Sequence, residues 1–241
     1  MPLIRVIDFE TTGLKPPEAA ICEIGWTDIL LDTDLAGQTD WTINGPQAMY
    51  VNPGHPIPPE ARGIHHICDR TVADSSPPST GLQLLTQGSP EVFAAHNAPY
   101  DRQFFGGGDT PWICTSKVAM RLWPEAPNAQ NQTLRYYLDI DGQYSFQPDR
   151  AIPPHRAGPD TYVTAHLVLK ALEAATISQM IEWTNQPSLL RGAIQFGKHR
   201  GTPWSKVVPS YLDWIVKQND MDADVKFTAR HWLNRRRSDD R

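Results

Sequence analysis

Short apolar runs alternate along this chain with polar segments that are rich in proline and glycine. The runs with the length and residue types of strands extend from Ile4 to the turn at Gly13 and then cover residues 20–31, 41–51, 91–95 and 112–114. The third run is interrupted at Asn44-Gly45-Pro46, a typical turn sequence. Because three strands come in succession before the helices begin, the pattern predicts a mixed sheet rather than a purely parallel one.

Apolar residues spaced three and four apart predict helices between and after these strands. They cover residues 58–63, 82–87, 98–105, 116–122, 131–138, 159–175, 209–217 and 222–237. A further strand is expected at residues 193–196, before a basic loop. The predicted fold class is α/β, with a mixed five-stranded sheet flanked by helices. We expect a domain of residues 1–176, a polar linker of residues 177–191 and a small basic module of residues 192–241.

The sequence shows no signal for secretion or membrane insertion. No segment approaches the roughly 18 consecutive apolar residues of a transmembrane helix, and the N-terminus lacks a basic stretch followed by an apolar core. The cysteines Cys22, Cys68 and Cys114 are scattered and form no CxxC pair, so neither a disulfide framework nor a zinc site is expected. These features predict a cytoplasmic protein with no membrane partner.

Charge is divided unevenly along the chain. Residues 1–191 carry 12 Lys and Arg against 21 Asp and Glu, whereas residues 192–241 carry 10 against 6. A basic module on an acidic body predicts an anionic partner, with nucleic acid as the first candidate. The alternative is that the basic residues only keep the C-terminus soluble.

Two acidic residues follow directly on the apolar run of the first strand. Because side chains alternate along a strand, Asp8 and Glu10 point to one face while Ile7 and Phe9 point to the other. Two like charges at the end of a buried strand repel each other and lose hydration, which a divalent cation with oxygen ligands would offset. The alternative is a strand that ends at a solvated acidic loop.

Two further acids stand at element boundaries. Asp101 lies at a strand-to-helix junction and Asp160 at the start of a helix, where an acid can also serve simply as a cap. Four carboxylates at one end of a sheet would hold two divalent metals, which clamp the attacking and leaving oxygens of a phosphoryl displacement. His155, on a proline-flanked loop before Asp160, is the candidate base that activates water.

Three motifs carry a family resemblance. Asp8-Phe9-Glu10-Thr11-Thr12-Gly13, His96-Asn97-Ala98-Pro99-Tyr100-Asp101 and His155-Arg156-Ala157-Gly158-Pro159-Asp160 resemble, in the same order, the three motifs of the DEDDh 3′–5′ exonuclease superfamily. The resemblance covers about residues 3–175 and implies an RNase H-like fold. It also implies hydrolysis of nucleic acid from the 3′ end to nucleoside 5′-monophosphates. The implied cofactors are two divalent Mg²⁺ ions, for which Mn²⁺ can substitute.

The motif match implies roles for individual residues. His155 would be the general base, and the metal ligands would be Asp8, Glu10, Asp101 and Asp160. Thr11 and Leu14 would lie against the terminal nucleotide, Thr11 by a polar contact and Leu14 as an apolar wedge, and His65 would face the substrate beside them. Tyr100 departs from the family pattern, which usually has Phe at this position.

The C-terminal segment is similar to the tail of the exonuclease X branch of this superfamily. The similarity rests on Phe196-Gly197-Lys198-His199-Arg200-Gly201 and on Tyr211-Leu212-Asp213-Trp214. It implies an exonuclease that acts on DNA 3′ ends, in a single strand or overhang, during repair or recombination. The flanking glycines would let Lys198 and Arg200 approach phosphates closely, unless they only shape a hairpin with solvated basic side chains.

Two other functions remain open at this point. The motifs do not separate DNA from RNA, because that choice depends on a few contacts with the 2′-hydroxyl group. An exoribonuclease that acts on short RNA is therefore the first alternative. The second is a nucleic-acid-binding module that has kept the fold and lost turnover.

Overall fold

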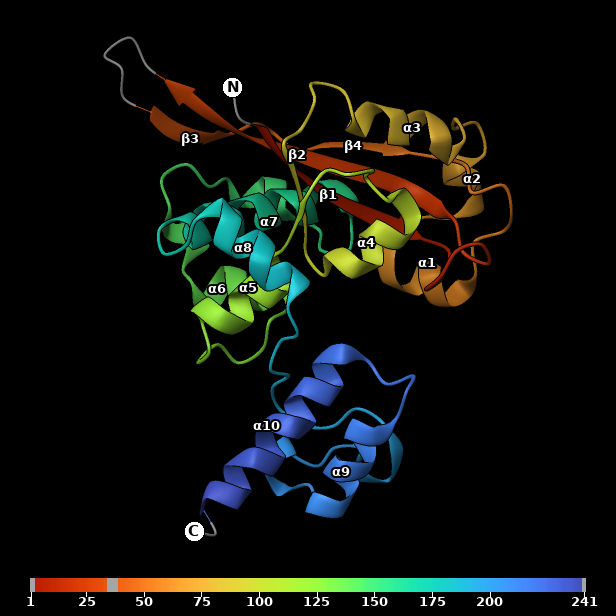
Figure 1. The fold of residues 1–241 in the computed structure, drawn as a ribbon. Coiled ribbons are helices and arrows are strands. Elements are labelled where there is room, and N and C mark those ends of the chain that lie inside the picture. The colour runs from red at the N-terminus through yellow and green to blue at the C-terminus, as the bar shows by residue number, and fades with distance from the viewer. Residues whose placement is uncertain (1–2, 34–38, 240–241) are drawn as a thin grey trace.

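One mixed sheet organises the larger part of the chain (Figure 1), for which a computed structural model describes residues 3–33 and 39–239. Its strands are β1 (Leu3–Thr11), β2 (Ile21–Thr33), β3 (Thr39–Ile43), β4 (Gln47–Tyr50), β5 (Val92–Ala95) and β6 (Trp112–Cys114). The order is β3-β2-β1-β5-β6, and β4 also pairs with β2. The first four strands pair antiparallel, whereas β5 joins β1 and β6 in parallel, so the predicted mixed sheet is confirmed.

The sheet has six strands rather than the five that were predicted. The difference arises in the predicted third strand, residues 41–51, which is divided at residues 44–46 into β3 and β4. Pro46 has no N–H group to donate to a neighbouring strand. Both halves still pair with β2, β3 beside its second half and β4 beside its first.

Every predicted helix is present, with its ends moved by a few residues. The helices are α1 (Pro59–His65), α2 (Asp69–Val72), α3 (Pro78–Leu85), α4 (Ala98–Phe105), α5 (Thr115–Leu122), α6 (Asn131–Tyr137), α7 (Ala157–Leu172), α8 (Ile177–Asn185), α9 (Pro209–Lys217) and α10 (Ala223–Asp239). The short α2 was not predicted. None of the helices in the described part of the chain has the length and apolar character of a membrane span.

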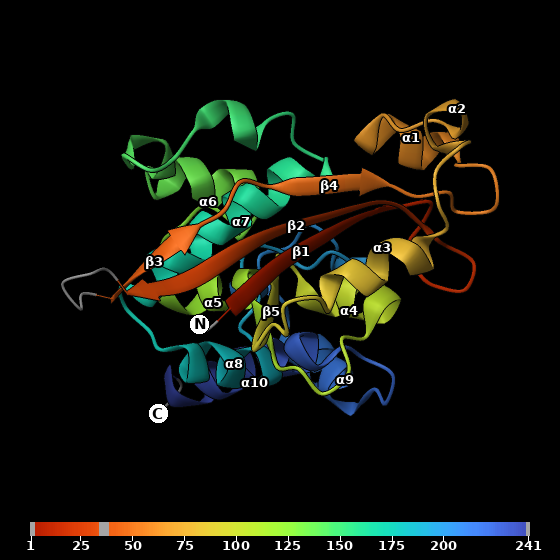
Figure 2. The same ribbon diagram turned by 90° about the horizontal axis from the view of Figure 1, so that it is seen from above.

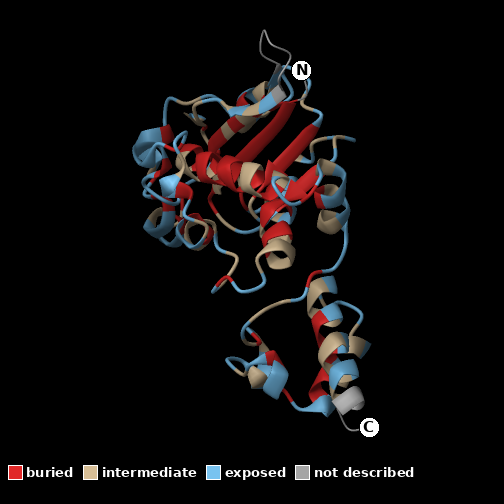
Figure 3. Cartoon of the chain, turned by 90° about the vertical axis from the view of Figure 1, so that its left-hand side faces the viewer, coloured by how far each residue is buried: buried red, intermediate tan, exposed pale blue. Residues whose placement is uncertain are grey.

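The two faces of β1 are buried by different helices. Ile4 and Val6 belong to the core shared with α5, α7 and α8, whereas Ile7 and Phe9 belong to the core shared with α3 and α4. Figure 2 shows the sheet between these groups of helices, and Figure 3 shows how the buried residues follow its strands. The predicted alternation is confirmed, and it turns Asp8 and Glu10 toward the side of α7.

The linker predicted at residues 177–191 is shorter in the structure. Its first half forms α8, where Met180 is buried in the core shared with α5 and α7. Thr176 and Gln179 form a capping box at the start of this helix, and the Thr184 hydroxyl accepts a hydrogen bond of 2.8 Å from the N–H of Cys114. The first domain therefore extends to about residue 185, because the apolar face of α8 packs on it.

The C-terminal module has an apolar core of its own. It is built from residues of α9, α10 and the preceding loops, which include Ile194, Trp204, Val207, Tyr211, Leu212, Ile215 and Ala229. The strand predicted at residues 193–196 is reduced to a single bridge between Ala193 and Pro203. Pro203 cannot donate a hydrogen bond, so the pairing does not extend along the chain. The basic loop turns at Gly197–His199, next to the start of α9.

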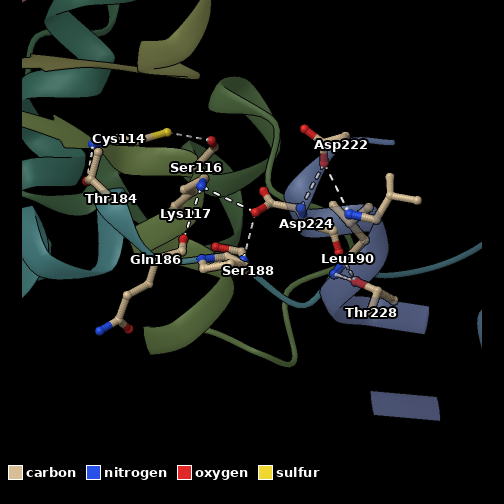
Figure 4. Close-up of polar contacts among 12 residues, drawn as sticks. Cys114, Ser116, Lys117, Thr184, Gln186, Ser188, Leu190, Asp222, Asp224 and Thr228 are labelled. Atoms are coloured by element: carbon tan, nitrogen blue, oxygen red, sulfur yellow. Dashed lines mark hydrogen bonds and ion pairs between the residues drawn. The ribbon is translucent and has the colours of Figure 1, made fainter. Parts of the chain in front are cut away.

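Polar contacts hold this module to the first domain (Figure 4). Lys117 of α5 lies 3.3 Å from Asp224 of α10, and both side chains are only 15% exposed. The same Asp224 oxygen accepts a hydrogen bond of 2.9 Å from the N–H of Ser188 in the connecting segment. On the other side, Arg191 donates to backbone carbonyl groups at the end of α5 and beyond, those of Ala119, Met120, Trp123 and Ala126.

Replacing Asp224 with Ala should loosen this connection. The change removes the partner of Lys117 and the acceptor of the Ser188 N–H, a loss of about 1–3 kcal/mol for partly buried groups. Trypsin should then cut after Arg191 about 10-fold faster, whereas the circular dichroism spectrum should be unchanged because the first domain stays folded. Glu173→Ala is the matched control, because it breaks the exposed pair with Lys170. Equal cleavage rates in both variants would show that Asp224 does not hold the module.

Candidate active site

Three carboxylates meet where β1 ends and α7 begins. Asp8, Glu10 and Asp160 each offer an oxygen, and these oxygens lie within 4.8 Å of one another. The meeting depends on Gly25 of β2, which lies opposite Asp8 in the sheet. A Cβ atom at Gly25 would lie 2.3 Å from the backbone carbon of Ala157, so only glycine lets α7 start this close to the sheet.

The fourth predicted acid, Asp101, is buried beside this group rather than within it. Asp101 lies in the first turn of α4 and is 1% exposed, and its Oδ1 atom has no hydrogen-bond partner among the described residues. Its charge nevertheless raises the pKa of Asp8. The left-handed conformation of Asn97, with φ of 73°, turns the chain from β5 into this helix.

Burial and mutual repulsion make the charged forms of these acids unfavourable. Burial, then the negative charges around it, raises the pKa of Asp8 well above its usual range and that of Glu10 to about 8. Burial also raises the pKa of Asp101 and of Asp160. Half-buried oxygen donors, together with an unpartnered oxygen of the buried Asp101, fit a hard divalent cation, which would supply the missing positive charge.

His155 stands on the loop that leads into α7. Its side chain is exposed, its φ is 59°, and its backbone N–H donates a hydrogen bond of 2.9 Å to Oδ2 of Asp160. The other oxygen of Asp160 accepts one of 3.2 Å from the side chain of Gln132. The backbone of His155 is therefore held at the carboxylate group, while its side chain remains open to solvent.

A buried ion pair anchors the same loop. Glu23 of β2 is 2% exposed and lies opposite Glu10 in the sheet. Its carboxylate accepts hydrogen bonds of 2.5 and 3.0 Å from the guanidinium of Arg156 and one of 3.0 Å from the N–H of Ala157. Arg156 also donates to the hydroxyl of Tyr50 at 2.6 Å. The sequence prediction missed Glu23; an acid between the apolar residues of a strand was the signal that it needed a buried partner.

Two cavities meet at the carboxylates. One, of about 430 Å³, runs from the end of β1 past Tyr100 to α1. The other, of about 510 Å³, extends toward His96 and residues 129–132. Both are lined by Asp8, His155 and Asp160. A separate cavity between β3 and the ends of α7 and α8 contains none of the motif residues.

The residues expected to touch a terminal nucleotide lie around the first cavity. Leu14 is 78% exposed at its mouth, together with Ile64, which is 54% exposed and was not singled out from the sequence. Thr11 and His65 form part of the wall and are almost buried. The hydroxyl of Thr11 donates to the carbonyl of Gly13 at 2.7 Å, and Nδ1 of His65 accepts from a backbone N–H. Their contact with substrate stays a prediction.

The structure does not bring Lys198 and Arg200 to this site. Both lie on the basic loop of the C-terminal module, and neither lines either cavity. Their predicted contact with phosphates therefore concerns a second surface of the protein.

Comparison with known proteins identifies the family. The family model described as Exonuclease, RNase_T, matches residues 6–168. The chain belongs to the exonuclease family. It is an exonuclease whose sequence is 33% identical to Exodeoxyribonuclease 10 of Escherichia coli strain K12, over 96% of this chain and 99% of the relative. A match of that length includes most of the C-terminal module.

Solved structures agree with this assignment and with the predicted RNase H-like fold. A structure of Exonuclease X in complex with 5′ overhanging duplex DNA has a TM-score of 0.57 and 31% identity, and the match covers 76% of this exonuclease and 99% of that chain. Escherichia coli Exonuclease I in complex with a dA16 oligonucleotide shares the fold, with a TM-score of 0.51, 16% identity, and coverage of 76% of this chain and 43% of that chain.

The metal-free exonuclease should lose stability as the pH rises from about 6.5 to about 8. Glu10 has a pKa of about 8 when folded and 4.5 ordinarily, so between these values the folded state keeps a proton that the unfolded state has released. The stability that protonated Glu10 allows is complete below about pH 4.5 and is lost progressively until the pH passes about 8. His96 and His166, with pKa values lowered to about 4, act oppositely but only below their ordinary 6.5. Thermal unfolding in EDTA measures the loss, which Glu10→Gln should reduce. An unchanged loss in that variant would contradict the assignment.

Replacing Glu23 with Gln should weaken both the fold and the activity. Arg156 loses its charged partner, at a cost of about 1–3 kcal/mol, and the loop of His155 loses its anchor to β2. Urea unfolding and exonuclease rate measure the two effects. Tyr50→Phe is the matched control, because it removes one hydroxyl contact from Arg156 and leaves the ion pair. If Glu23→Gln behaves like Tyr50→Phe in both measurements, the ion pair does not hold the loop.

Proposed function

We propose that this exonuclease is a metal-dependent 3′–5′ exodeoxyribonuclease that releases nucleoside 5′-monophosphates from DNA and works in repair or recombination. The observation that carries the proposal is the group formed by Asp8, Glu10 and Asp160, whose oxygens lie within 4.8 Å of one another beside an exposed histidine. The proposed ions are two divalent metals, Mg²⁺ or, as its substitute, Mn²⁺.

The acidic residues and His155 divide the chemistry between them. Asp8, Glu10, Asp101 and Asp160 would hold the ions, which would supply positive charge to the phosphoryl displacement. His155 takes the proton of the attacking water, since a neutral imidazole can accept a proton near neutral pH. The hydrogen bond from its backbone to Asp160 keeps it at the carboxylates during this step.

The two cavities suggest how the 3′ end is seated. They share Asp8, His155 and Asp160, so a scissile phosphate between them has the terminal nucleoside on one side and the next nucleotide on the other. The terminal nucleoside occupies the cavity of about 430 Å³, with Leu14 as an apolar wedge at its mouth and Thr11 and His65 in its wall. A deoxyribonucleoside is small enough for this space.

DNA is the preferred substrate in this proposal. The Escherichia coli relative is named an exodeoxyribonuclease, and the solved relatives hold a 5′ overhanging duplex, whose 3′ end is recessed, or a dA16 oligonucleotide. The proposed partner is a DNA 3′ end in a single strand or overhang, and Lys198 and Arg200 contact its phosphates. The retained motif residues argue against an inactive binding module. A cytoplasmic location is part of the proposal. The three free cysteines are consistent with it, because thiols stay reduced in that compartment.

The test offers matched 3′-overhang DNA and RNA to the purified protein with Mg²⁺, Mn²⁺ or EDTA. Release of nucleoside 5′-monophosphates from DNA should need the metal and disappear in Asp8→Ala. His155→Ala should lower kcat by about 10²–10⁴-fold, as expected for loss of a general base. Glu18→Gln, a change at an exposed acid on the connection between β1 and β2, is the control.

Faster hydrolysis of RNA than of DNA would overturn the choice of substrate and favour the exoribonuclease alternative. Binding of either strand without metal-dependent turnover would favour the inactive module. Circular dichroism of Asp8→Ala separates loss of chemistry from loss of fold.

A further inference from the structure

A stack of aromatic rings lies on the C-terminal module, away from the proposed active site. The rings of Tyr211 and Trp214 stack, with centroids 5.1 Å apart and an angle of 21° between the planes. The ring of His199 lies against them at a tilt, with its centroid 4.5 Å from that of Tyr211 and an angle of 52° between the planes. Tyr211 is 8% exposed, whereas Trp214 is 45% exposed. The stack therefore leads from the core of the module to an indole ring at its surface.

The exposed indole is not needed for the packing of the module. α9 buries Tyr211, Leu212 and Ile215, and the module core also contains the buried Trp204. Trp214 makes its ring contact with Tyr211 and leaves nearly half of its surface to solvent. A large apolar ring exposed in this way is typical of a binding surface.

The basic loop lies directly against the same stack. Gly197 has a φ of 61°, and a Cβ atom there would lie 2.2 Å from the hydroxyl oxygen of Tyr211, so glycine is what lets the loop lie this close to the ring. The Lys198 ammonium lies 5.3 Å from the centroid of the Tyr211 ring. Arg200 is exposed, and its guanidinium has no partner among the described residues. Cations and stacked rings thus share one surface.

We propose that Lys198, His199, Arg200, Tyr211 and Trp214 form a stacking surface for an unpaired stretch of DNA. One base stacks on the exposed face of Trp214, and the phosphates beside it contact Lys198 and Arg200. Aromatic rings beside cationic side chains are the common way to bind single strands without sequence preference. The inference rests on the proposed DNA substrate and adds a second binding place for the same strand.

Charge and base pairing select this occupant. The body of the chain is acidic, with 12 Lys and Arg against 21 Asp and Glu in residues 1–191, so the strand gains its attraction from the basic module. In duplex DNA the bases are paired and stacked on each other, which leaves Trp214 without a partner. A preference for unpaired DNA is therefore the property that separates this surface from a general basic patch.

The position of the module makes such a surface useful. Figure 1 shows α10 below the helices of the first domain, and Figures 1 and 2 agree that α9 lies toward the side of α4, the helix that carries Asp101. The contacts of Asp224 and Arg191 fasten the connection between module and domain. A strand held on α9 stays near the active site after each cut, which raises its effective concentration there.

Binding without turnover tests the stacking surface directly. Fluorescence anisotropy in EDTA compares labelled single-stranded (dT)20 with a blunt duplex of the same length, using the full-length protein. Trp214→Ala should weaken binding of the single strand about 10-fold and change duplex binding by less than about twofold. Trp214→Phe should restore most of the loss. Phe227→Ala is the matched control, because Phe227 is 41% exposed on the same module but outside the stack.

The cations have their own readout. Lys198→Ala with Arg200→Ala should weaken both DNA forms and reduce the salt slope of binding by about 2, while Arg230→Ala on α10 serves as the control. The proposal would be overturned if the Trp214→Ala variant bound (dT)20 as tightly as the Phe227→Ala variant does. It would also be overturned if a poly-glutamate peptide competed with labelled (dT)20 as effectively as unlabelled (dT)20 does, because the surface would then select only negative charge.

A small substrate separates this inference from the proposed function. Thymidine 5′-(4-nitrophenyl) phosphate reaches only the catalytic cavity, so Trp214→Ala should hydrolyse it at the unchanged rate. If the unaltered protein hydrolyses neither this compound nor any DNA in the presence of Mn²⁺, the proposed function fails. If it hydrolyses both and Trp214→Ala binds single strands normally, the stacking surface alone is wrong.

Discussion

The structure depends on holding like-charged, half-buried carboxylates close together. Asp8, Glu10 and Asp160 bring their oxygens within 4.8 Å of one another, although repulsion and burial raise the pKa of each. Side chains that repel each other separate unless the backbone prevents it. β1 prevents this from one side, because it is paired along both edges, and α7 does so from the other, because it packs across the face to which these acids point.

Residues without chemistry of their own decide how close β1 and α7 come. Gly25 admits the backbone of Ala157, and Glu23 binds Arg156 and the first N–H of the helix. A buried ion pair adds little net stability, since desolvation offsets its attraction, but its geometry is specific. The pair ties the residue next to His155 to the strand next to Glu10. The spacing of the active groups is therefore a property of β2 as much as of β1.

The C-terminal module is attached in a different way. It has an apolar core of its own, and an ion pair and hydrogen bonds centred on Lys117, Asp224 and Arg191 join it to the first domain. Interfaces of this kind are typical between units that fold around separate cores. Because directional bonds rather than a shared core fasten the module, the basic loop and the outer face of α9 remain exposed. That exposure is what allows the module to bind something in addition to the catalytic cavity.

The sequence by itself determined the chemistry of the site and the kind of fold. Alternation along β1 put Asp8 and Glu10 on one face, and three motifs in order indicated the family before any contact was known. Only the tertiary structure decided which residues support that chemistry. Glu23 and Arg156 are 133 positions apart and meet only through the register of β2 and the docking of α7.

The same limit explains the other differences between expectation and structure. α8 looked like linker because its apolar residues gain meaning only against β6 and α5, and the division into β3 and β4 follows from pairing with β2. The tilted ring contact between His199 of the basic loop and Tyr211 of α9 also joins separate segments. Local patterns carry the propensities of neighbouring residues, whereas contacts between distant segments depend on register and docking, which no single stretch of sequence contains.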